Sequence, residues 1–390
     1  MGMSLRIAVA ALTILFSRQC LLAQQPSIEE LIAKATGEDS IEAAEAVAAL
    51  GERKPVEKRV VDALIAALSD NREAEIIPPF VPAPAPTIAM RASRALTQIG
   101  KPAVEPLCEL LRAEMRTSQR LDAKRDESGR TMRNAIDALA GMRGDAIASL
   151  PTLRDVLNSE SEQLRLLTVA AIAAIDSDPA SIQLHLHGML DDPSPEIRSE
   201  VVQALSGCGE KAAPSIAKLI ALLDDPADRT EWFSPDFAGS RALRADVAVA
   251  LGEIGMPAVA ALPRLKIMMT DDEDPPVRVS AAFAVAKLDV QSVEAIRFLI
   301  LSLDKDKHGP GVVEEAAEGL GRLGSVARFA VPALIRLAKE LDAEEAGIDR
   351  HAVIRATRAL PDLERVAKKD ENEDVRAAAV NAIKLIRDAK

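Results

Sequence analysis

The chain reads LRADVAVALGEIG from Leu243 to Gly255, MPAVAALPRLKIM from Met256 to Met268, and DDEDPPVR from Asp271 to Arg278. Apolar residues of the first stretch recur at helical spacing, which predicts a helix with one buried face. Gly255 is a favoured residue at a helix C-terminus, and Pro257 suits the first turn of the next helix. The acidic third stretch ends that second helix and opens another Ala-rich one. The sequence here therefore predicts a helical hairpin followed by the start of the next hairpin.

The same Ala-rich pattern recurs along the chain and is closed each time by an apolar residue, which we call the anchor residue. The anchor residues are Leu50, Leu96, Leu139, Ile172, Leu205, Leu251, Val285, Leu320, Leu360 and Ile383. Several of the intervals lie near 34 residues, which is long enough for two helices and two turns. A single hairpin of this kind cannot bury its apolar face alone, so neighbouring hairpins must stack. We therefore predict an all-α fold, an α-solenoid (α-α superhelix) of about ten helical hairpins.

Two further junctions resemble the one at Asp271, namely DDPSPEIR at Asp191–Arg198 and DENEDVR at Asp370–Arg376. On these residues the chain resembles HEAT repeats, particularly the HEAT-like repeats named after phycobilisome lyases, over about residues 27–390. The resemblance implies that an arginine of each Ala-rich helix bonds to acidic side chains of neighbouring repeats. We expect a structural ladder of such arginines: Arg165, Arg198, Arg244, Arg278 and Arg376.

The N-terminus has the anatomy of a signal peptide. A positively charged start precedes an apolar run, Ile7–Phe16, and Ala23 is a suitable cleavage residue. This run is too short to span a bilayer comfortably, although retention of the segment as a membrane anchor remains the alternative. We expect residues 1–23 to be a signal peptide, residues 24–390 to form one solenoid without a membrane span, and the protein to be exported to the periplasm or the extracellular space.

The charge of the chain is strongly negative, with a net value of −12. Nucleic-acid binding draws most of its affinity from basic groups that neutralise phosphates, so we expect no nucleic-acid partner. An acidic surface favours basic protein partners. Only Cys108 and Cys208 remain after signal cleavage, and they lie about two repeats apart, so no disulfide is expected.

The longest intervals between anchor residues contain insertions, which we expect between the first and second helix of each repeat and therefore on one rim of the solenoid. Four aromatic residues lie in two of the insertions. They are either anchors for a protein partner or plugs that cover helix ends. The insertions are roughly residues 70–86, 113–130, 226–240 and 341–350, and the aromatic residues are Phe80, Trp232, Phe233 and Phe237.

One segment is similar to a calcium-binding loop. Asp304 to Glu315 reads DKDKHGPGVVEE, which places Asp304, Asp306 and Glu315 at loop positions one, three and twelve. His308 stands at position five, where an oxygen ligand is usual. The standard enzymatic motifs are missing from the sequence, and no His precedes Glu as it does in the iron-binding deoxyhypusine hydroxylases that share HEAT-like repeats. We therefore expect no catalytic residue and no cofactor.

These observations favour an exported, monomeric scaffold that binds other proteins through its concave face or through the rim of loops. Two alternatives stay open. One is an enzyme or enzyme subunit related to HEAT-like lyases, and the other is a calcium-responsive binding module.

Overall fold

The structure is a computed structural model of the 390-residue chain. It describes residues 26–74, 86–118, 125–225, 242–304 and 307–323, with the single residues 368 and 380, and within them it gives only the backbone of residues 118, 125–128 and 310. The chain divides into two compact units, Met1–Asp176 and Ser177–Lys390. We treat each unit by itself. The predicted signal peptide, residues 1–23, lies outside the described residues.

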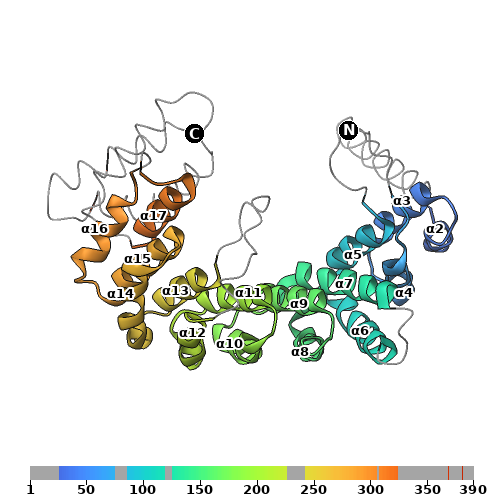
Figure 1. Cartoon of the computed structure of the whole chain (residues 1–390). Helices are drawn as coiled ribbons and strands as arrows, with labels where there is room; N and C mark the ends of the chain where they lie inside the picture. Colours follow the sequence, from blue (N-terminus) through green and yellow to red (C-terminus); the bar gives the residue numbers. More distant parts are fainter. Residues whose placement is uncertain are drawn as a thin grey trace, which may run out of the picture. The chain divides into compact units, whose positions relative to one another are not determined.

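The N-terminal unit consists of helical hairpins (Figure 1). Its Ala-rich first helices α3, α5, α7 and α9 pack against one another in chain order. The second helices α4, α6 and α8 cover one side of this layer, as Figure 1 shows. The elements are α2 (Ile28–Ala35), α3 (Ser40–Gly51), α4 (Lys58–Ala66), η1 (Ala67–Ser69), α5 (Ile88–Ile99), η2 (Lys101–Ala103), α6 (Val104–Ser118), α7 (Arg125–Met142), η4 (Arg143–Ser149), α8 (Leu150–Val156) and α9 (Glu162–Ile175).

The C-terminal unit repeats this arrangement. Its first helices α11, α13, α15 and α17 pack in chain order, and α12, α14 and α16 each pack against a first helix. We call the two sets of helices the first-helix layer and the second-helix layer in both units. The elements are α10 (Pro179–Leu186), η5 (His187–Asp191), α11 (Pro195–Ser206), η6 (Gly209–Ser215), α12 (Ile216–Leu222), α13 (Leu243–Ile254), η8 (Met256–Ala261), α14 (Leu262–Asp271), α15 (Pro275–Leu288), α16 (Val293–Leu301) and α17 (Pro310–Leu323).

The predicted all-α solenoid is confirmed by this sequential packing of hairpins within each unit. The described residues form no β-strand, and an isolated β-bridge joins Glu73 and Thr87. No helix in the described part of the chain combines the length and the apolar character that a membrane crossing requires.

Side chains at the junctions explain where the first helices begin. The side chains of Asp39, Ser161 and Ser194 accept hydrogen bonds from backbone N–H groups in the first turns of α3, α9 and α11. These N–H groups have no partner within the helix, so a capping side chain stabilises each start by about 1 kcal/mol. The polar junctions between repeats therefore set the helix starts.

The turn between the two helices of a hairpin is short. Gly100 and Gly255 end α5 and α13 with φ angles of 74° and 80°, a left-handed region that favours glycine. We expected the second helix to begin at Pro257, but a 3₁₀ segment, η8, comes first and α14 begins at Leu262. Pro263 lacks the N–H that would close an α-helical bond to the carbonyl of Val259. A 3₁₀ segment therefore begins this second helix.

Small residues let neighbouring first helices approach closely. A Cβ added to Gly51 would lie 2.7 Å from the Cβ of Ala95, and one added to Gly252 would lie 3.0 Å from the Cα of Ala284. Side chains of most other residues would not fit at these two contacts. The anchor residues from Leu50 to Leu320 are at most 2 % exposed and form the core around these contacts.

The placement of the insertions differs from our expectation. Residues 70–86 follow η1 and precede α5, and residues 226–240 follow α12 and precede α13. Counted from the Ala-rich helix, these insertions join the second helix of one repeat to the first helix of the next. Glycine ends the first helix in the hairpins of α5 and α13, whereas the junction between repeats is a loop that tolerates added length. Residues 341–350 lie outside the described residues.

Candidate binding surface

One side of the first-helix layer faces solvent. An inner helix such as α5 is covered by α3, by α7 and by the second helix α4, so a single stripe of its surface stays open. The exposed residues of these helices follow helical spacing, as expected for one open side. In the N-terminal unit this exposed stripe includes Glu42 and Glu45 on α3, Met90, Arg94 and Gln98 on α5, Arg130 and Asp137 on α7, and Gln163 and Ala174 on α9.

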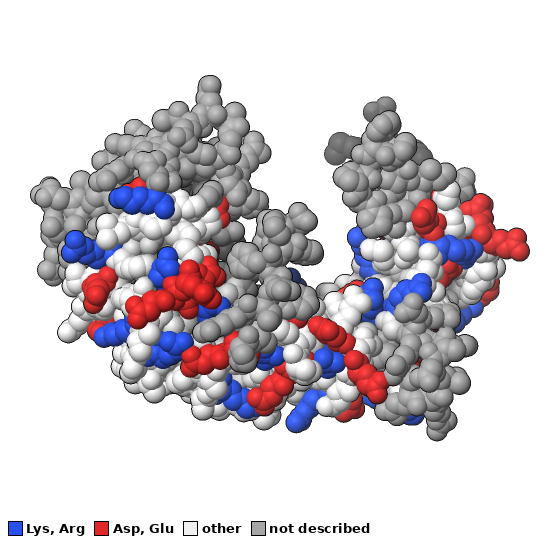
Figure 2. Space-filling view, viewed as in Figure 1, with Lys and Arg blue, Asp and Glu red and all other residues white. Residues whose placement is uncertain are grey.

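The charge of the exposed stripe changes from helix to helix in the N-terminal unit. Helix α3 contributes Glu42 and Glu45, whereas α5 carries two arginines and no acid. Figure 2 shows basic side chains over the region of α5 and α7 and acidic ones over α2 and α3. Helix α9 has no charged residue from Leu166 to its end. The stripe therefore runs from acidic through basic to apolar.

Charged side chains link three successive first helices in the C-terminal unit. The carboxylate of Glu253 on α13 lies 3.4 Å from Lys287 on α15 and 2.5 Å from Arg322 on α17. Both cations lie over the ring of buried Phe283, at 5.7 Å and 4.8 Å from its centroid. Such contacts with a ring face are attractive because the face is electron-rich. We call this group the Glu253 cluster.

Two carboxylates lie close to each other between α11 and α13. Asp246 is buried and accepts a hydrogen bond from Ser199 Oγ at 2.7 Å. Burial raises the pKa of the Glu200 carboxyl, and the negative charge of Asp246 raises it further. Glu200 is therefore easier to protonate than an ordinary glutamate.

Four of the five predicted ladder arginines lie in the described part of the chain. Arg198 is buried, donates to the carbonyls of Asp192 and Pro193 at 2.6 and 3.2 Å, and lies 2.7 Å from the Asp225 carboxylate. The Arg198 guanidinium thus connects the junction before α11 to the junction after α12. Arg244 makes two 3.0 Å bonds to the Asp272 carboxylate.

Arg165 and Arg278 make the same kind of hydrogen bonds to preceding backbone carbonyls as Arg198 does. Each donates to the carbonyls six and five residues before it, at 2.9 and 3.3 Å for Arg165 and at 2.5 and 3.4 Å for Arg278. Arg376 lies outside the described residues. The described ladder arginines therefore hold the junctions between repeats through hydrogen bonds to backbone carbonyls and carboxylates.

The carboxylate of Asp272 shows the electrostatic effect of the ladder. Burial acts to raise its pKa, but hydrogen bonds from Arg244 and from the backbone N–H of Asp274 lower the pKa below its ordinary value. The ionised form is favoured because these donors bond to it.

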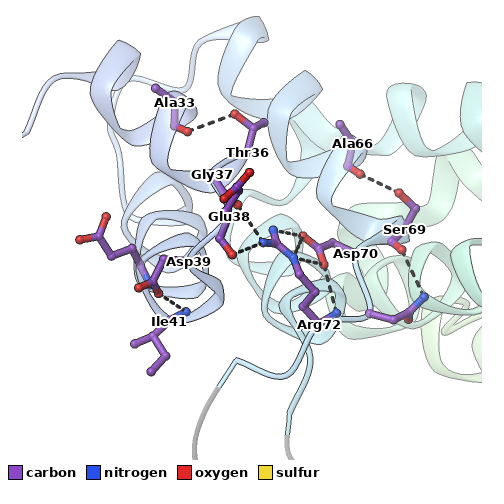
Figure 3. Close-up of polar contacts among 12 residues, drawn as sticks. Ala33, Thr36, Gly37, Glu38, Asp39, Ile41, Ala66, Ser69, Asp70 and Arg72 are labelled. Carbon is purple, nitrogen blue, oxygen red and sulfur yellow. Dashed lines mark hydrogen bonds and ion pairs between the residues drawn. The ribbon is translucent and has the colours of Figure 1, made fainter.

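The first described repeat obtains its guanidinium from an unexpected position (Figure 3). In α3, the residue equivalent to Arg198 is Ala43. Arg72, which follows the second helix, donates to the carbonyls of Gly37 and Glu38, both at 2.8 Å, and lies 2.6 Å from Asp70. Gly37 and Glu38 lie six and five residues before Ala43, and Asp70 lies 27 residues after it, as Asp225 lies after Arg198.

Arg72 therefore occupies in space the position that an arginine at residue 43 would fill. Its hydrogen bond lowers the pKa of Asp70 below the ordinary value, an effect that burial of the carboxyl partly opposes. Arg72 also stands at the start of the insertion 70–86, so it ties the base of that insertion to the first repeat.

The predicted aromatic residues Phe80, Trp232, Phe233 and Phe237 all lie outside the described residues. Their role as partner anchors or as plugs stays a prediction.

The predicted calcium loop is described only in part. Asp304 pairs with Lys307 at 2.7 Å, and Glu315 is buried and accepts a hydrogen bond from Ser280 at 3.0 Å. Asp306 lies outside the described residues. Among the residues that are described, no group of three or more His, Cys, Asp or Glu side chains is placed to hold a metal ion. Cys108 and Cys208 are buried thiols that are not joined in a disulfide.

Sequence reasoning missed Arg72 and the Glu253 cluster. The cluster has a sequence signal, because Glu253, Lys287 and Arg322 each lie two positions after an anchor residue. Comparing that position across repeats would have shown an acid followed by two bases in three successive repeats. Arg72 has no such signal, because its contacts depend on how the chain turns back after α4.

Comparisons with known proteins agree with this arrangement. Residues 117–206, 150–232 and 262–356 match the sequence model of a family described as HEAT repeats, and together these segments cover more than half of the chain. A search of curated proteins finds no match.

Several solved structures are similar in fold. The complex of CpcE and CpcF of phycocyanin lyase from Nostoc sp. PCC7120 is 19% identical, with 93% of this chain and 95% of that chain covered and a TM-score of 0.38. Yeast importin-β (Kap95p) is 11% identical, with 96% and 58% covered and a TM-score of 0.45. A structure of importin beta in an ammonium sulfate condition is 12% identical, with 91% and 50% covered and a TM-score of 0.48. This chain thus spans 58% and 50% of the lengths of these two importin chains.

Proposed function

We propose, since this chain belongs to the HEAT-repeat family, that it is a scaffold whose first-helix layer binds other proteins. The continuous exposed stripe of this layer carries the proposal. Successive first helices pack side by side in each unit, so their open sides combine into one surface with rows of polar and charged residues. A partner that lies across several helices contacts many such rows, and stacked repeats commonly bind in this way.

We further propose that the mature protein acts outside the cytoplasm, after cleavage near Ala23. The charged start, the short apolar run and the small residue at the cleavage site support this location. The rim of insertions is a second candidate surface, supported by the aromatic residues within it. Both surfaces belong to a binding role and neither requires catalysis.

Site-specific photo-crosslinking in the native cell envelope tests the binding surface. A photoreactive amino acid is placed at Gln98 in one variant and at Gln203 in another, both exposed on the first-helix layer. Matched variants carry it at Asp155 on α8 and at Ala221 on α12, which are exposed on the second-helix layer. We expect a defined partner protein to be crosslinked at the first two positions and not at the control positions, as identified by mass spectrometry.

A further variant with the photoreactive residue at Trp232 tests the rim. Crosslinking confined to this variant would move the binding surface from the first-helix layer to the insertions. Equal crosslinking at Asp155 and Ala221 would contradict a binding role for the first-helix layer. N-terminal sequencing of the recovered protein shows whether it begins at Gln24, and recovery of a chain that still carries residues 1–23 would contradict cleavage.

A further inference from the structure

The exposed stripe of the N-terminal unit gathers basic side chains on two adjacent helices. Thr97 Oγ1 on α5 donates to the carbonyl of Ala138 on α7 at 3.1 Å, which places residue 97 beside residue 138. Both helices run in the same direction because each is the first helix of its hairpin. Arg91 on α5 therefore lies at the level of residue 132 on α7, between Arg130 and Arg133, and Arg94 lies at the level of residue 135, about half a turn beyond Arg133.

These four arginines form what we call the α5–α7 basic stripe: Arg91, Arg94, Arg130 and Arg133. Arg94 and Arg130 are exposed, and Arg133 is half-buried and donates to Gln163 Oε1 at 2.5 Å. Among the described side chains of α5 and α7, the single acid is Asp137. The stripe therefore carries a net positive charge on a chain whose overall charge is −12.

The surroundings of the basic stripe restrict what can lie on it. On one side, α3 presents Glu42 and Glu45, which would repel a continuing row of phosphates. On the other side, α9 presents Leu166, Leu167 and Ala170, which offer apolar contact and no charge. A nucleic acid needs cations along its whole track. A peptide needs them only where its own acids lie, and it can bury aliphatic side chains next to them.

We propose that the α5–α7 basic stripe binds an acidic segment of a partner protein, with aliphatic residues of that segment lying on α9. The inference rests on the proposed function, because it specifies the charge of the partner at one part of the first-helix layer. The net charge of the chain favours a basic partner, whereas this part of the surface favours an acidic one. Arginine suits this role because its planar guanidinium binds a carboxylate through two parallel hydrogen bonds.

Fluorescence anisotropy with a short labelled peptide tests the proposal on the mature full-length protein. The probe has a run of glutamates followed by leucines, and a second probe has lysines in place of the glutamates. We expect the glutamate probe to bind, its affinity to fall as NaCl is raised, and the lysine probe to bind more weakly. The double variant Arg94→Gln/Arg130→Gln should weaken binding of the glutamate probe by about tenfold.

The matched control removes two positive charges from the second-helix layer of the same unit. Lys58 on α4 and Arg154 on α8 are both exposed, so Lys58→Gln/Arg154→Gln changes the net charge equally. We expect less than about a twofold effect from this control. Equal weakening by both double variants would show a general charge effect and overturn the site.

Other outcomes overturn the proposal in distinct ways. If the glutamate probe does not bind, or binds with an affinity that Arg94→Gln/Arg130→Gln leaves unchanged, the stripe is not an acidic-segment site. If a single-stranded oligonucleotide binds more tightly than the probe with the same variant dependence, the ligand is a nucleic acid. A partner crosslinked at Gln98 whose capture is insensitive to Arg94→Gln/Arg130→Gln would leave the scaffold function standing and remove only this inference.

Discussion

At the scale of single residues, two ion pairs in one junction have nearly the same length and very different surroundings. Arg198 lies 2.7 Å from Asp225, with side chains 7% and 13% exposed, whereas Arg264 lies 2.6 Å from Asp224, with side chains 32% and 64% exposed. Breaking a buried pair leaves a charge without its partner, while an exposed pair is replaced by water. Burial therefore determines which pair stabilises the stack.

We predict that Arg198→Met destabilises α11 and α12 by about 3 kcal/mol, because the mostly buried Asp225 carboxylate loses its ion pair with Arg198. Arg264→Met, the matched control, should cost less than about 1 kcal/mol. Native-state hydrogen exchange of the amides in these helices measures both effects, since it reports local opening in a repeat protein. Equal losses in the two variants would contradict the role assigned to the buried pair. Partial recovery in Arg198→Met/Asp225→Leu would support it.

Because Arg72 lies where an arginine at residue 43 would lie, we predict that Ala43→Arg restores the stability lost in Arg72→Ala. Arg72→Ala should destabilise α3 and α4 by about 1 kcal/mol, since the pair with Asp70 is partly exposed and two carbonyls lose their donor. Adding Ala43→Arg should restore most of the loss, because an arginine there reaches the same three partners. Hydrogen exchange of α3 and α4 measures the effect. If Ala43→Arg lowers protection further, the two positions are not equivalent in space.

At the scale of helices, the contact between α11 and α13 predicts a dependence on pH. The pKa of Glu200 is raised in the folded protein, so protonation favours folding, and the ionised form opposes it at neutral pH. Stability linked to this group increases as pH falls through the raised folded pKa toward the ordinary value of 4.5, and it is lost as pH rises.

We therefore expect Glu200→Gln to raise the Tm at pH 7.5 and to have little effect below pH about 4, where the unfolded chain also protonates its glutamates. Glu210→Gln, at an exposed position in η6, is the control and should leave the Tm nearly unchanged at both pH values. Thermal unfolding followed by circular dichroism measures the difference. A lower Tm for Glu200→Gln at pH 7.5 would show that the ionised carboxylate is stabilising.

The Glu253 cluster acts at the same scale, because it joins three helices on their exposed side. One carboxylate holds two cations against the ring of Phe283, so α13, α15 and α17 are linked in addition to their apolar contacts. The corresponding positions in the N-terminal unit are Glu52, Gln98, Gly141 and Ala174, so this unit has no cation there to form an equivalent cluster. The two units therefore stabilise their first-helix layers by different means.

At the scale of the whole chain, hydrophobic periodicity predicted the fold because every repeat buries the same side of its first helix. The eight anchor residues from Leu50 to Leu320 are all buried in the described core. The sequence also predicted the four ladder arginines that the structure describes, because each lies seven residues before an anchor residue.

The rest depends on contacts that periodicity does not encode. The insertions were placed in the wrong turn because interval length alone does not tell which of two turns holds the extra residues. The positive charge of the α5–α7 basic stripe was missed because the net charge of −12 sums over the whole chain. Arg91 and Arg94 become a surface feature only when α7 packs beside α5 and adds its own arginines.

The guanidinium of Arg72 also affects how repeats are counted in this chain. The family match begins at residue 117, although α3 and α5 already pack as first helices of complete hairpins. A repeat count based on an arginine at this site of the first helix would pass over α3, because Ala43 stands there. Arg72 nevertheless connects the carbonyls of Gly37 and Glu38 to the Asp70 carboxylate there. Counting repeats from aligned sequence positions therefore finds fewer than the folded chain contains.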